Sequence, residues 1–379
     1  MRFIHLADLH LGKRVCEMSM LDDQTYILDQ ILQLVQEHRA DAVLIAGDVY
    51  DRPVPPPEAV AVLDRFLTRL QAQGVACLLI PGNHDSDERL AFGARLLDGA
   101  GVYLAPVFDG TVRTVTLRDA WGDVQFTLLP FLRPAQVRRY FPDVEPGDYE
   151  GAVRAVLETV PAAPDARRVL LAHQFVTARG VAPERCESEL ASVGTLDNVD
   201  VSAFDGFDYV ALGHIHGPQR IGRDTVRYAG SPLKFSFSEV HHKKSVPLVT
   251  LGAKGQVEIE RLPLTPQRDL REIRGALDDL LHPEPGAKTD DYLHITLTDE
   301  AVLDAMNKVR TVYPNTLRLD FDNTLTRQTG TPELENRPAL RAPFELFSEF
   351  YEKQNGQPMD ADMQALVRTM LDEMGEGNA

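Results

Sequence analysis

The chain has 379 residues, 44% of them hydrophobic and 25% charged, which is typical of a soluble globular protein of two or three domains. It contains neither a leader-like N-terminus nor an apolar run long enough to cross a bilayer, so we expect a cytoplasmic protein with no membrane anchor. The three cysteines, Cys16, Cys77 and Cys186, include no CxxC pair. That spacing argues against a disulfide framework and against a thiolate metal site.

The formal net charge is −18. A protein that binds a polyanion through its own surface normally carries a basic patch. Either this chain does not bind nucleic acid, or cations or a partner neutralise the phosphates locally.

Strands and helices alternate along the first part of the chain. The apolar patterns predict strands in RFIHLAD, DAVLIAGD and VACLLIPGNHD, with helices over 22–37 and 58–71 between them. This alternation predicts a parallel sheet with helices on both faces. Catalytic groups on such sheets gather at the carboxyl ends of the strands.

After a Pro- and Gly-containing bridge at about 142–164, RRVLLAHQF and 207–212 predict two more strands. TVRYAG, VPLVTLG and QVEIERLPL predict shorter strands and an antiparallel edge. Prolines near 263–269 suggest a boundary. A small strand–helix–strand–helix–strand unit follows, in which we expect strands at LREI, DYLHITL and TLRLDF, one helix ending near Leu281 and the other over 300–312.

The C-terminal segment follows a linker-like stretch at 328–343 and has two helical patterns. One apolar face holds aromatic residues and the other is rich in methionine. Such a hairpin either packs on its own domain or docks a partner. The candidate partner-binding residues are Phe344, Phe347, Phe350, Tyr351, Met363, Leu366 and Met370.

Ligand-type residues follow five of the predicted strands. Each one alone has an ordinary explanation as a helix cap or a turn, but chance does not readily place them all at one sheet edge. Carboxylates, an amide and imidazoles suit Mn, Fe or Zn, and seven ligands are about right for two ions. The metal-ligand candidates are Asp8, His10, Asp48, Asn83, His173, His214 and His216.

The ordered motifs ADLH, AGDVYD, PGNHD, AHQF and GHIH resemble those of the calcineurin-like metallophosphoesterases, and YAGSPLKFSFSE resembles the SbcD nucleases within that superfamily. The resemblance implies an α/β fold: a sandwich of two sheets flanked by helices, a small α/β cap domain and a C-terminal helical hairpin. The implied domains are a nuclease domain at 1–264, a cap at 265–327, a linker at 328–343 and an ATPase-docking hairpin at 344–379.

The resemblance also implies roles for individual residues. One metal ion would be held by Asp8, His10, Asp48 and His216, and the other by Asp48, Asn83, His173 and His214. His84 would donate a proton to the leaving oxygen. Some relatives have a histidine three residues after the bridging aspartate, where this chain has Asp51, so we assign Asp51 no catalytic role.

The resemblance implies a Mn-dependent DNA nuclease with double-strand exonuclease and single-strand endonuclease activity. It would act in DNA repair as a homodimer, in complex with an SbcC-type ATPase. The alternatives are a phosphatase or nucleotidase acting on a small substrate, and a non-catalytic scaffold. All the ligand positions are filled, which argues against the scaffold, and the additional cap and hairpin favour a large substrate.

Overall fold

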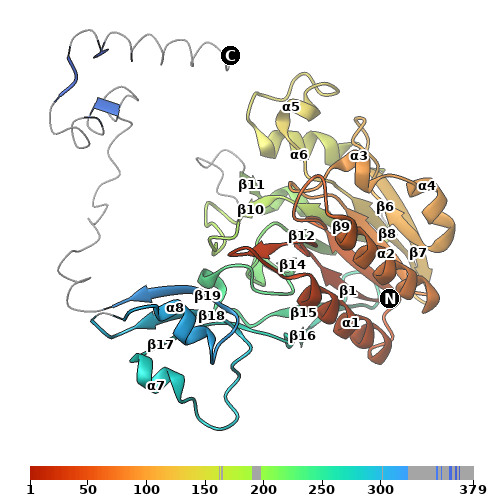
Figure 1. The fold of residues 1–379 in the computed structure, drawn as a ribbon. Coiled ribbons are helices and arrows are strands. Elements are labelled where there is room, and N and C mark those ends of the chain that lie inside the picture. The colour runs from red at the N-terminus through yellow and green to blue at the C-terminus, as the bar shows by residue number, and fades with distance from the viewer. Residues whose placement is uncertain are drawn as a thin grey trace. The chain divides into compact units, whose positions relative to one another are not determined.

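The computed structural model describes residues 1–322 except 162, 164, 190–197 and 301. Beyond residue 322 it describes 347, 348, 351, 358–360, 363, 364 and 367. Residues 1–321 form one compact unit and 322–379 a second. The first unit contains all the strands and helices that position the candidate site (Figure 1).

The first sheet has six strands in the order β16-β15-β1-β4-β5-β6. Parallel pairing joins β1 (Arg2–Leu6), β4 (Ala42–Ala46), β5 (Ala76–Ile80) and β6 (Val102–Leu104). An antiparallel edge is formed by β15 (Ser245–Leu251) and β16 (Val257–Pro263). The predicted parallel strands and the predicted antiparallel edge are both confirmed.

The second sheet also has six strands, in the order β13-β14-β12-β9-β8-β7. Its central strands β9 (Arg167–His173) and β12 (Tyr209–Gly213) pair in parallel and were expected. The hairpin of β7 (Arg113–Asp119) and β8 (Gly122–Leu128) was not predicted, although it completes this sheet. The other edge is formed by β13 (Gln219–Ile221) and β14 (Arg223–Tyr228).

The two sheets pack face to face. Phe3, Leu44 and Leu78 of the first sheet share one buried cluster with Phe126 and Tyr209 of the second. Because alternate side chains of a strand point to opposite faces, the outer faces need their own cover. The structure is thus a two-sheet α/β sandwich, as predicted.

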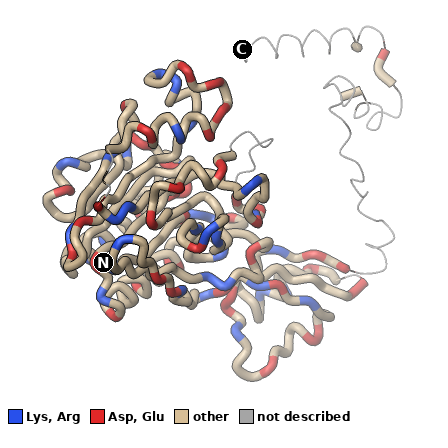
Figure 2. The backbone as a smooth tube through the Cα atoms, turned by 180° about the vertical axis from the view of Figure 1, so that it is seen from behind, with Lys and Arg blue, Asp and Glu red and all other residues tan. Residues whose placement is uncertain are grey.

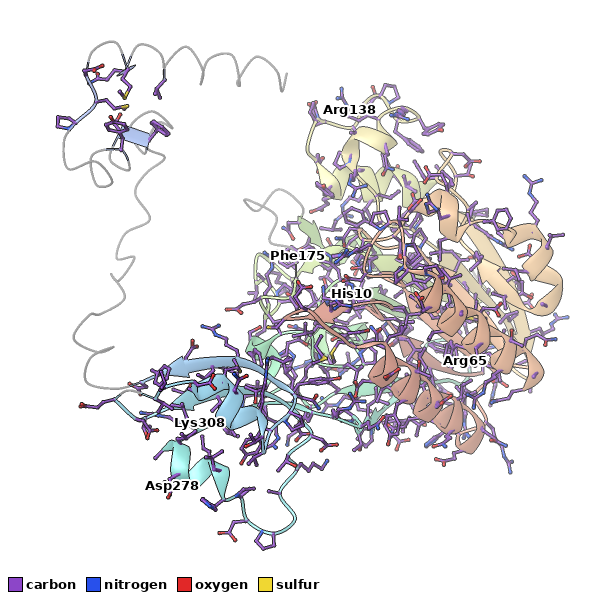
Figure 3. The ribbon with its side chains drawn as sticks, viewed as in Figure 1. His10, Arg65, Arg138, Phe175, Asp278 and Lys308 are labelled. Carbon is purple, nitrogen blue, oxygen red and sulfur yellow. The ribbon has the colours of Figure 1, made fainter. Side chains whose placement is uncertain are left out.

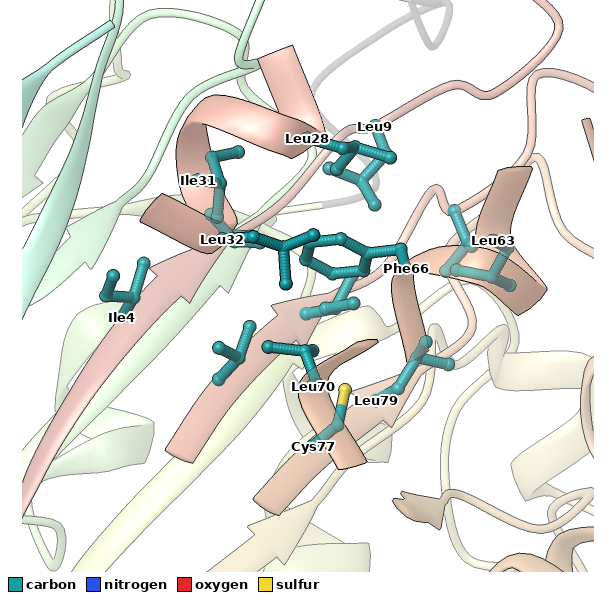
Figure 4. Packing of buried hydrophobic residues seen from close by; sticks show 14 of the residues in the cluster. Ile4, Leu9, Leu28, Ile31, Leu32, Leu63, Phe66, Leu70, Cys77 and Leu79 are labelled. Atoms are coloured by element: carbon teal, nitrogen blue, oxygen red, sulfur yellow. The ribbon is translucent and has the colours of Figure 1, made fainter. Parts of the chain in front are cut away.

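Helices α1 (Leu21–Glu37) and α2 (Pro57–Ala72) cover the outer face of the first sheet. Their bounds agree with the predicted helices to within one residue. Figure 4 shows Phe66 and Leu70 of α2 packed with Leu32 of α1 and with Cys77 and Leu79 of β5. The three cysteines are free thiols, as the sequence indicated.

The prediction of a bridge at 142–164 is wrong in one respect, because this segment contains helix α6 (Tyr149–Glu158). Asp148 caps this helix by accepting a hydrogen bond from the Gly151 amide at 2.8 Å. Its buried face packs on the second sheet through Val153 and Val156. Short helices α3 (Asp87–Leu90), α4 (Ala94–Leu97) and α5 (Pro134–Val137) complete this part of the chain.

The small unit has the predicted order: β17 (Leu270–Gly275), α7 (Leu277–Leu281), β18 (Tyr292–Leu297), α8 (Ala305–Arg310) and β19 (Thr316–Phe321). Its strands form a parallel sheet in the order β17-β18-β19. The predicted start of α8 was wrong by five residues. Asp304 has a φ of 56°, a left-handed conformation that a helix interior does not accept, so α8 begins after it.

Side chains tie this unit to the sandwich. The buried Tyr292 hydroxyl donates a hydrogen bond at 2.7 Å to Asp23 of α1, whose carboxylate also lies 3.6 Å from Arg268. Lys234 forms a second ion pair with Asp269 at 2.9 Å. The proposed division at residue 264 therefore lies within a region of continuous side-chain contact, and it remains a prediction.

Charges of both signs are interspersed along the described chain (Figure 2). None of the helices described has both the length and the apolar character needed to cross a membrane.

Candidate metal centre

The strand exits that carry the ligand-type residues have an unusual backbone. Asp8, His10, Asp48 and His214 have φ values of 53°, 43°, 49° and 101°. Residues other than glycine rarely adopt positive φ, because the β-carbon then clashes with the backbone. Such conformations cluster at functional sites, where the surrounding structure imposes them. Four of the seven candidate ligands therefore have this strained backbone.

Glycines beside these residues allow the two sheets to approach each other closely. A β-carbon at Gly47, where φ is +88°, would lie 2.3 Å from His173 Nδ1. A β-carbon at Gly213 would lie 2.0 Å from the Ala46 carbonyl oxygen. Any side chain there would push the β9 and β12 exits away from the β4 exit, so glycine is required.

Asp8, His10 and His216 form one group, in which a ligand atom of each lies within 4.8 Å of the others. The Nε2 atoms of His10 and His216 are 3.1 Å apart. Asp8 is completely buried, and its carboxylate accepts a hydrogen bond from the His214 amide at 2.9 Å. The first and last motifs of the sandwich, 206 residues apart along the chain, therefore meet here.

Asn83, His173 and His214 form a neighbouring group. Asn83 Oδ1 lies 3.1 Å from His173 Nε2 and 3.0 Å from His214 Nδ1. Asp48 lies between the groups, because its Oδ2 is 3.3 Å from His173 Nε2 and 3.6 Å from His10 Nε2. All seven predicted ligand side chains are brought together at one edge of the sandwich.

The arrangement fits a bound cation. The Nδ1–H of His173 donates to the Ala46 carbonyl oxygen at 2.7 Å. In the neutral ring, the Nε2 atom therefore carries no hydrogen, and its lone pair points at the oxygens of Asp48 and Asn83. Three electron-rich atoms then face one another with no hydrogen between them, which only a proton or a metal ion relieves. His10 Nδ1 is also buried and has no hydrogen-bond partner among the described residues.

Burial and mutual charge set the pKa values of these groups. Burial raises the pKa of Asp8 to about 6 and lowers that of His214 to about 3. Burial also disfavours the charged forms of Asp48 and His173, but the attraction between the carboxylate and the imidazolium outweighs the effect of burial. The pKa of Asp48 therefore lies well below its usual range, and that of His173 is raised to about 9. A proton and a cation thus compete for one position between these two side chains.

A second layer of residues orients His216 and was not predicted from the sequence. Ser188 donates a hydrogen bond to the buried Glu239 at 2.5 Å and lies 2.8 Å from His216 Nδ1. Because its one hydrogen goes to Glu239, Ser188 accepts from His216 Nδ1–H, which leaves His216 Nε2 free to bind a metal. Lys244 Nζ completes the network at 2.6 Å from Glu239. Cys186 lies beside it, with Sγ 3.1 Å from Ser188 Oγ.

The charge of Glu239 follows from this network. Burial would raise the pKa of Glu239, but its hydrogen bond with His216 and the charge of Lys244 hold that pKa well below the usual range. Glu239 is the last residue of the YAGSPLKFSFSE tract, which carries the resemblance to SbcD. A glutamate at the end of that tract, followed closely by Lys244, was the one sequence feature that pointed to this network.

His84 lies at the mouth of the site, with its side chain 16% exposed. Its backbone amide donates to Asp48 Oδ1 at 2.9 Å, and its ring Nδ1 lies 3.0 Å from the Asp51 carbonyl oxygen. A carbonyl can only accept, so Nδ1 carries a hydrogen and Nε2 is the atom left for exchange with solvent or substrate. His84 Nε2 is 4.0 Å from Asp48 Oδ2.

Two other carboxylates near the site have structural partners. Asp85 accepts hydrogen bonds from the backbone amides of Val49, Tyr50 and Gly82. Its carboxylate therefore holds the loops that follow β4 and β5 in place and is not a metal-ligand candidate. Asp51 forms an ion pair with Lys13 at 2.8 Å.

Gln24 of α1 supports the His10 loop directly. Its amide donates to the carbonyl oxygens of Leu9 and His10 at 3.0 and 2.7 Å and accepts from the Gly12 amide at 3.0 Å. These bonds hold the loop in its left-handed conformation.

The fold and the site define a metal-dependent phosphoesterase, and comparison with known proteins agrees. Residues 1–218 match the family described as calcineurin-like phosphoesterase, and residues 266–355 match a family described as Type 5 capsule protein repressor C-terminal domain. The chain belongs to the calcineurin-like phosphoesterase family, among its SbcD members. Membership implies divalent metal ions, and the His and Asp groups described above are close enough together to hold them.

The SbcD subunit of the nuclease SbcCD from Staphylococcus epidermidis is 33% identical to this chain over 330 residues, covering 86% of this chain and 87% of that protein. Among solved structures, a dimetal phosphatase from Danio rerio matches with 14% identity and a TM-score of 0.42, covering 69% of this chain and 96% of that one.

The predicted partner-binding residues are only partly described. Phe347, Tyr351 and Met363 are among the described residues, whereas Phe344, Phe350, Leu366 and Met370 lie outside them. The docking role of the hairpin remains a prediction.

Proposed function

We propose that this chain is a metal-dependent DNA nuclease that processes DNA ends or hairpins in repair, with double-strand exonuclease and single-strand endonuclease activity. The observation that carries the proposal is the convergence of seven ligand-type side chains at one sheet edge, with the ring of His84 at its mouth. The Staphylococcus relative is by name part of a nuclease, which supports DNA as the substrate. We place the protein in the cytoplasm, by resemblance to SbcD.

We assign two metal positions. Asp8, His10, Asp48 and His216 would hold one ion, and Asp48, Asn83, His173 and His214 the other, with Asp48 as the bridge. Two divalent ions, with Mn as the activating metal, would polarise the phosphoryl group and activate the attacking water. The distances of Asp48 Oδ2 from His10 and from His173 support its position between the two.

The side chains of the protein supply the remaining chemistry. His84 holds its Nδ1 hydrogen on the Asp51 carbonyl oxygen, so its Nε2 is presented toward the reacting phosphate. From Nε2 the protonated ring would give its hydrogen to the departing sugar oxygen, a contribution of about 10²–10⁴ in rate. Glu239 and Ser188 would keep His216 in one orientation throughout.

The proposed assembly is a homodimer bound to an SbcC-type ATPase. Phe92 and Leu96, which are 85% and 87% exposed around α4, offer an apolar surface that a second copy would cover. The apolar C-terminal hairpin, including Phe347 and Met363, would dock the ATPase. The molar mass of the purified chain in solution, alone and with the ATPase, tests both contacts.

Hydrolysis assays separate the nuclease from the phosphatase or nucleotidase alternative. With Mn added, we expect cleavage of a linear duplex and of bis-p-nitrophenyl phosphate, and much slower release from p-nitrophenyl phosphate. Rapid hydrolysis of phosphomonoesters with no cleavage of DNA, even with the ATPase present, would favour the alternative.

A further inference from the structure

Two arginines lie on aromatic rings beside the metal centre. Arg185 Cζ is 3.7 Å from the centroid of the Phe175 ring, and Arg133 Cζ is 5.1 Å from that of Phe131. The rings of Phe175 and Phe131 lie 6.4 and 6.5 Å from the imidazole of His214. Each guanidinium is thus separated from a metal-ligand candidate by a single ring. Figure 3 labels Phe175 and, for the metal centre, His10.

These two arginines differ from the surface arginines that form ion pairs. Arg118 and Arg220, for example, form ion pairs with neighbouring aspartates at 2.9 and 2.7 Å. Arg133 and Arg185 are exposed, and within the described part of the chain no carboxylate lies within ion-pair distance of either guanidinium. An aromatic ring orients a guanidinium without neutralising it, so its N–H groups stay available to an anion.

The two arginines come from different parts of the fold. Arg133 follows β8 and begins α5, whereas Arg185 lies between β10 (Phe175–Thr177) and β11 (Asn198–Asp200). Two separate segments of the chain therefore each place a cation one aromatic ring away from His214. The planar guanidinium forks match phosphate oxygens in a bidentate geometry.

We propose that Arg133 and Arg185 form a clamp for the phosphodiester groups that flank the scissile bond. The clamp rests on the proposed nuclease function and adds the residues that hold the strand. Since each ring is already covered by a guanidinium, the contact is to backbone phosphate rather than to a stacked base, and it is independent of sequence. Two cations with no ion-pair partner among the described residues would help a chain of net charge −18 to receive a polyanion.

The test measures binding of a short single-stranded oligonucleotide by the full chain in EDTA, at several salt concentrations. Arg133→Ala and Arg185→Ala should each weaken binding by about tenfold. Each should reduce the slope of log Kd against log salt by about 0.7, the value for one phosphate contact on a single strand. Arg65→Ala is the matched control, because Arg65 is exposed on α2 and lies away from His10 (Figure 3).

Conservative variants separate charge from geometry. Arg185→Lys should keep the salt slope and lose part of the affinity, because lysine has the charge but not the planar fork. A double alanine variant with unchanged Kd and salt slope would overturn the clamp while leaving the nuclease function intact. A double variant with a lowered melting temperature would also overturn it, since the weaker binding would then follow from damage to the fold. A wild-type chain that neither bound nor cut DNA would refute the nuclease function, and the clamp with it.

Discussion

At the scale of single residues, the metal centre depends on hydrogen bonds that orient the imidazole rings of its candidate ligands. His173 is fixed by the Ala46 carbonyl and His216 by Ser188 and Glu239. Each of these contacts takes the hydrogen on Nδ1 and leaves Nε2 directed at the site. Three substitutions separate the roles of bridging, proton donation and orientation.

The first substitution is Asp48→Ala, which removes the carboxylate between the two groups of ligands. Metal content and phosphodiester cleavage should fall together, because the closely spaced imidazoles would face two cations with no bridging negative charge. Elemental analysis beside an activity assay measures both. Two ions per chain and an ordinary rate in this variant would refute the bridging role.

The second is His84→Ala, which should keep the metal ions and lose roughly 10²–10⁴-fold in rate. His84 contacts the Asp48 carboxylate only through its backbone amide at hydrogen-bond distance, and that amide survives the substitution. Loss of metal from the variant would instead make His84 a ligand.

The third is Glu239→Gln, which should weaken metal binding by about 10–100-fold, the usual effect of removing an outer partner of a ligating histidine. Because Lys244 would be left with its charge buried, the double variant Glu239→Gln, Lys244→Met restores neutrality. Calorimetric titration with Mn should still show weak binding in the double variant. Glu258→Gln, on the exposed face of β16, is the control. Recovery of full affinity by the double variant would show that only the charge imbalance mattered.

At the scale of elements, the strand exits could be predicted well and the connections poorly. Alternating strands and helices locate β1, β4, β5, β9 and β12 from the sequence, and with them every candidate ligand. The hairpin of β7 and β8 was missed even though its apolar residues alternate around Trp121, a pattern that the prolines and glycines nearby obscured. Helix α6 was missed for the same reason.

The supporting residues could not be predicted, for a physical reason. Ser188 lies 51 residues from Glu239 along the chain, and only the burial of Glu239 makes its contacts with Ser188 and Lys244 strong. Likewise, nothing in the spacing of Arg133 and Arg185 shows that each covers a ring beside His214. Motifs report the chemistry of one strand end, whereas these contacts depend on the packing of two sheets.

The contact of the small unit with α1 gives a prediction at this scale. Tyr292→Phe removes the hydroxyl that donates to the buried Asp23, which should cost about 1–3 kcal/mol of unfolding free energy because Asp23 loses a partner. Tyr313→Phe is the control, since Tyr313 is also nearly buried in this unit and its hydroxyl has no hydrogen bond within the described chain. Equal losses of stability in denaturant titrations of the two variants would contradict the argument.

At the scale of the whole molecule, the catalytic unit and the C-terminal segment are predicted to do different work. An isolated pair of short apolar helices is not stable in water, so the hairpin predicted at 344–379 would need a surface to cover. If that surface belongs to an SbcC-type ATPase, residues 1–321 would carry out the chemistry and the residues beyond them would bind the partner.

Deletion from Phe344 onward tests this division. The truncated chain should keep its melting temperature and its hydrolysis of bis-p-nitrophenyl phosphate, and should no longer co-purify with the ATPase or show ATP-stimulated cutting of duplex DNA. Phe347→Asp combined with Phe350→Asp should reproduce the loss of binding. A lower melting temperature with retained ATPase binding would mean that the hairpin packs on its own chain.

Helix α1 contacts both the small unit and the loop that carries His10, so it connects these two parts of the chain. Two consecutive residues of α1 contact different parts of this unit: Asp23 accepts a hydrogen bond from Tyr292 of the small unit, and Gln24 donates to the loop that carries His10. A partner that tilts the small unit would therefore shift α1 and, through a single peptide bond, the backbone behind a metal ligand. Such a shift would need no rearrangement of either sheet, so a force that the proposed ATPase applied to the small unit would have only a short path to the metal centre.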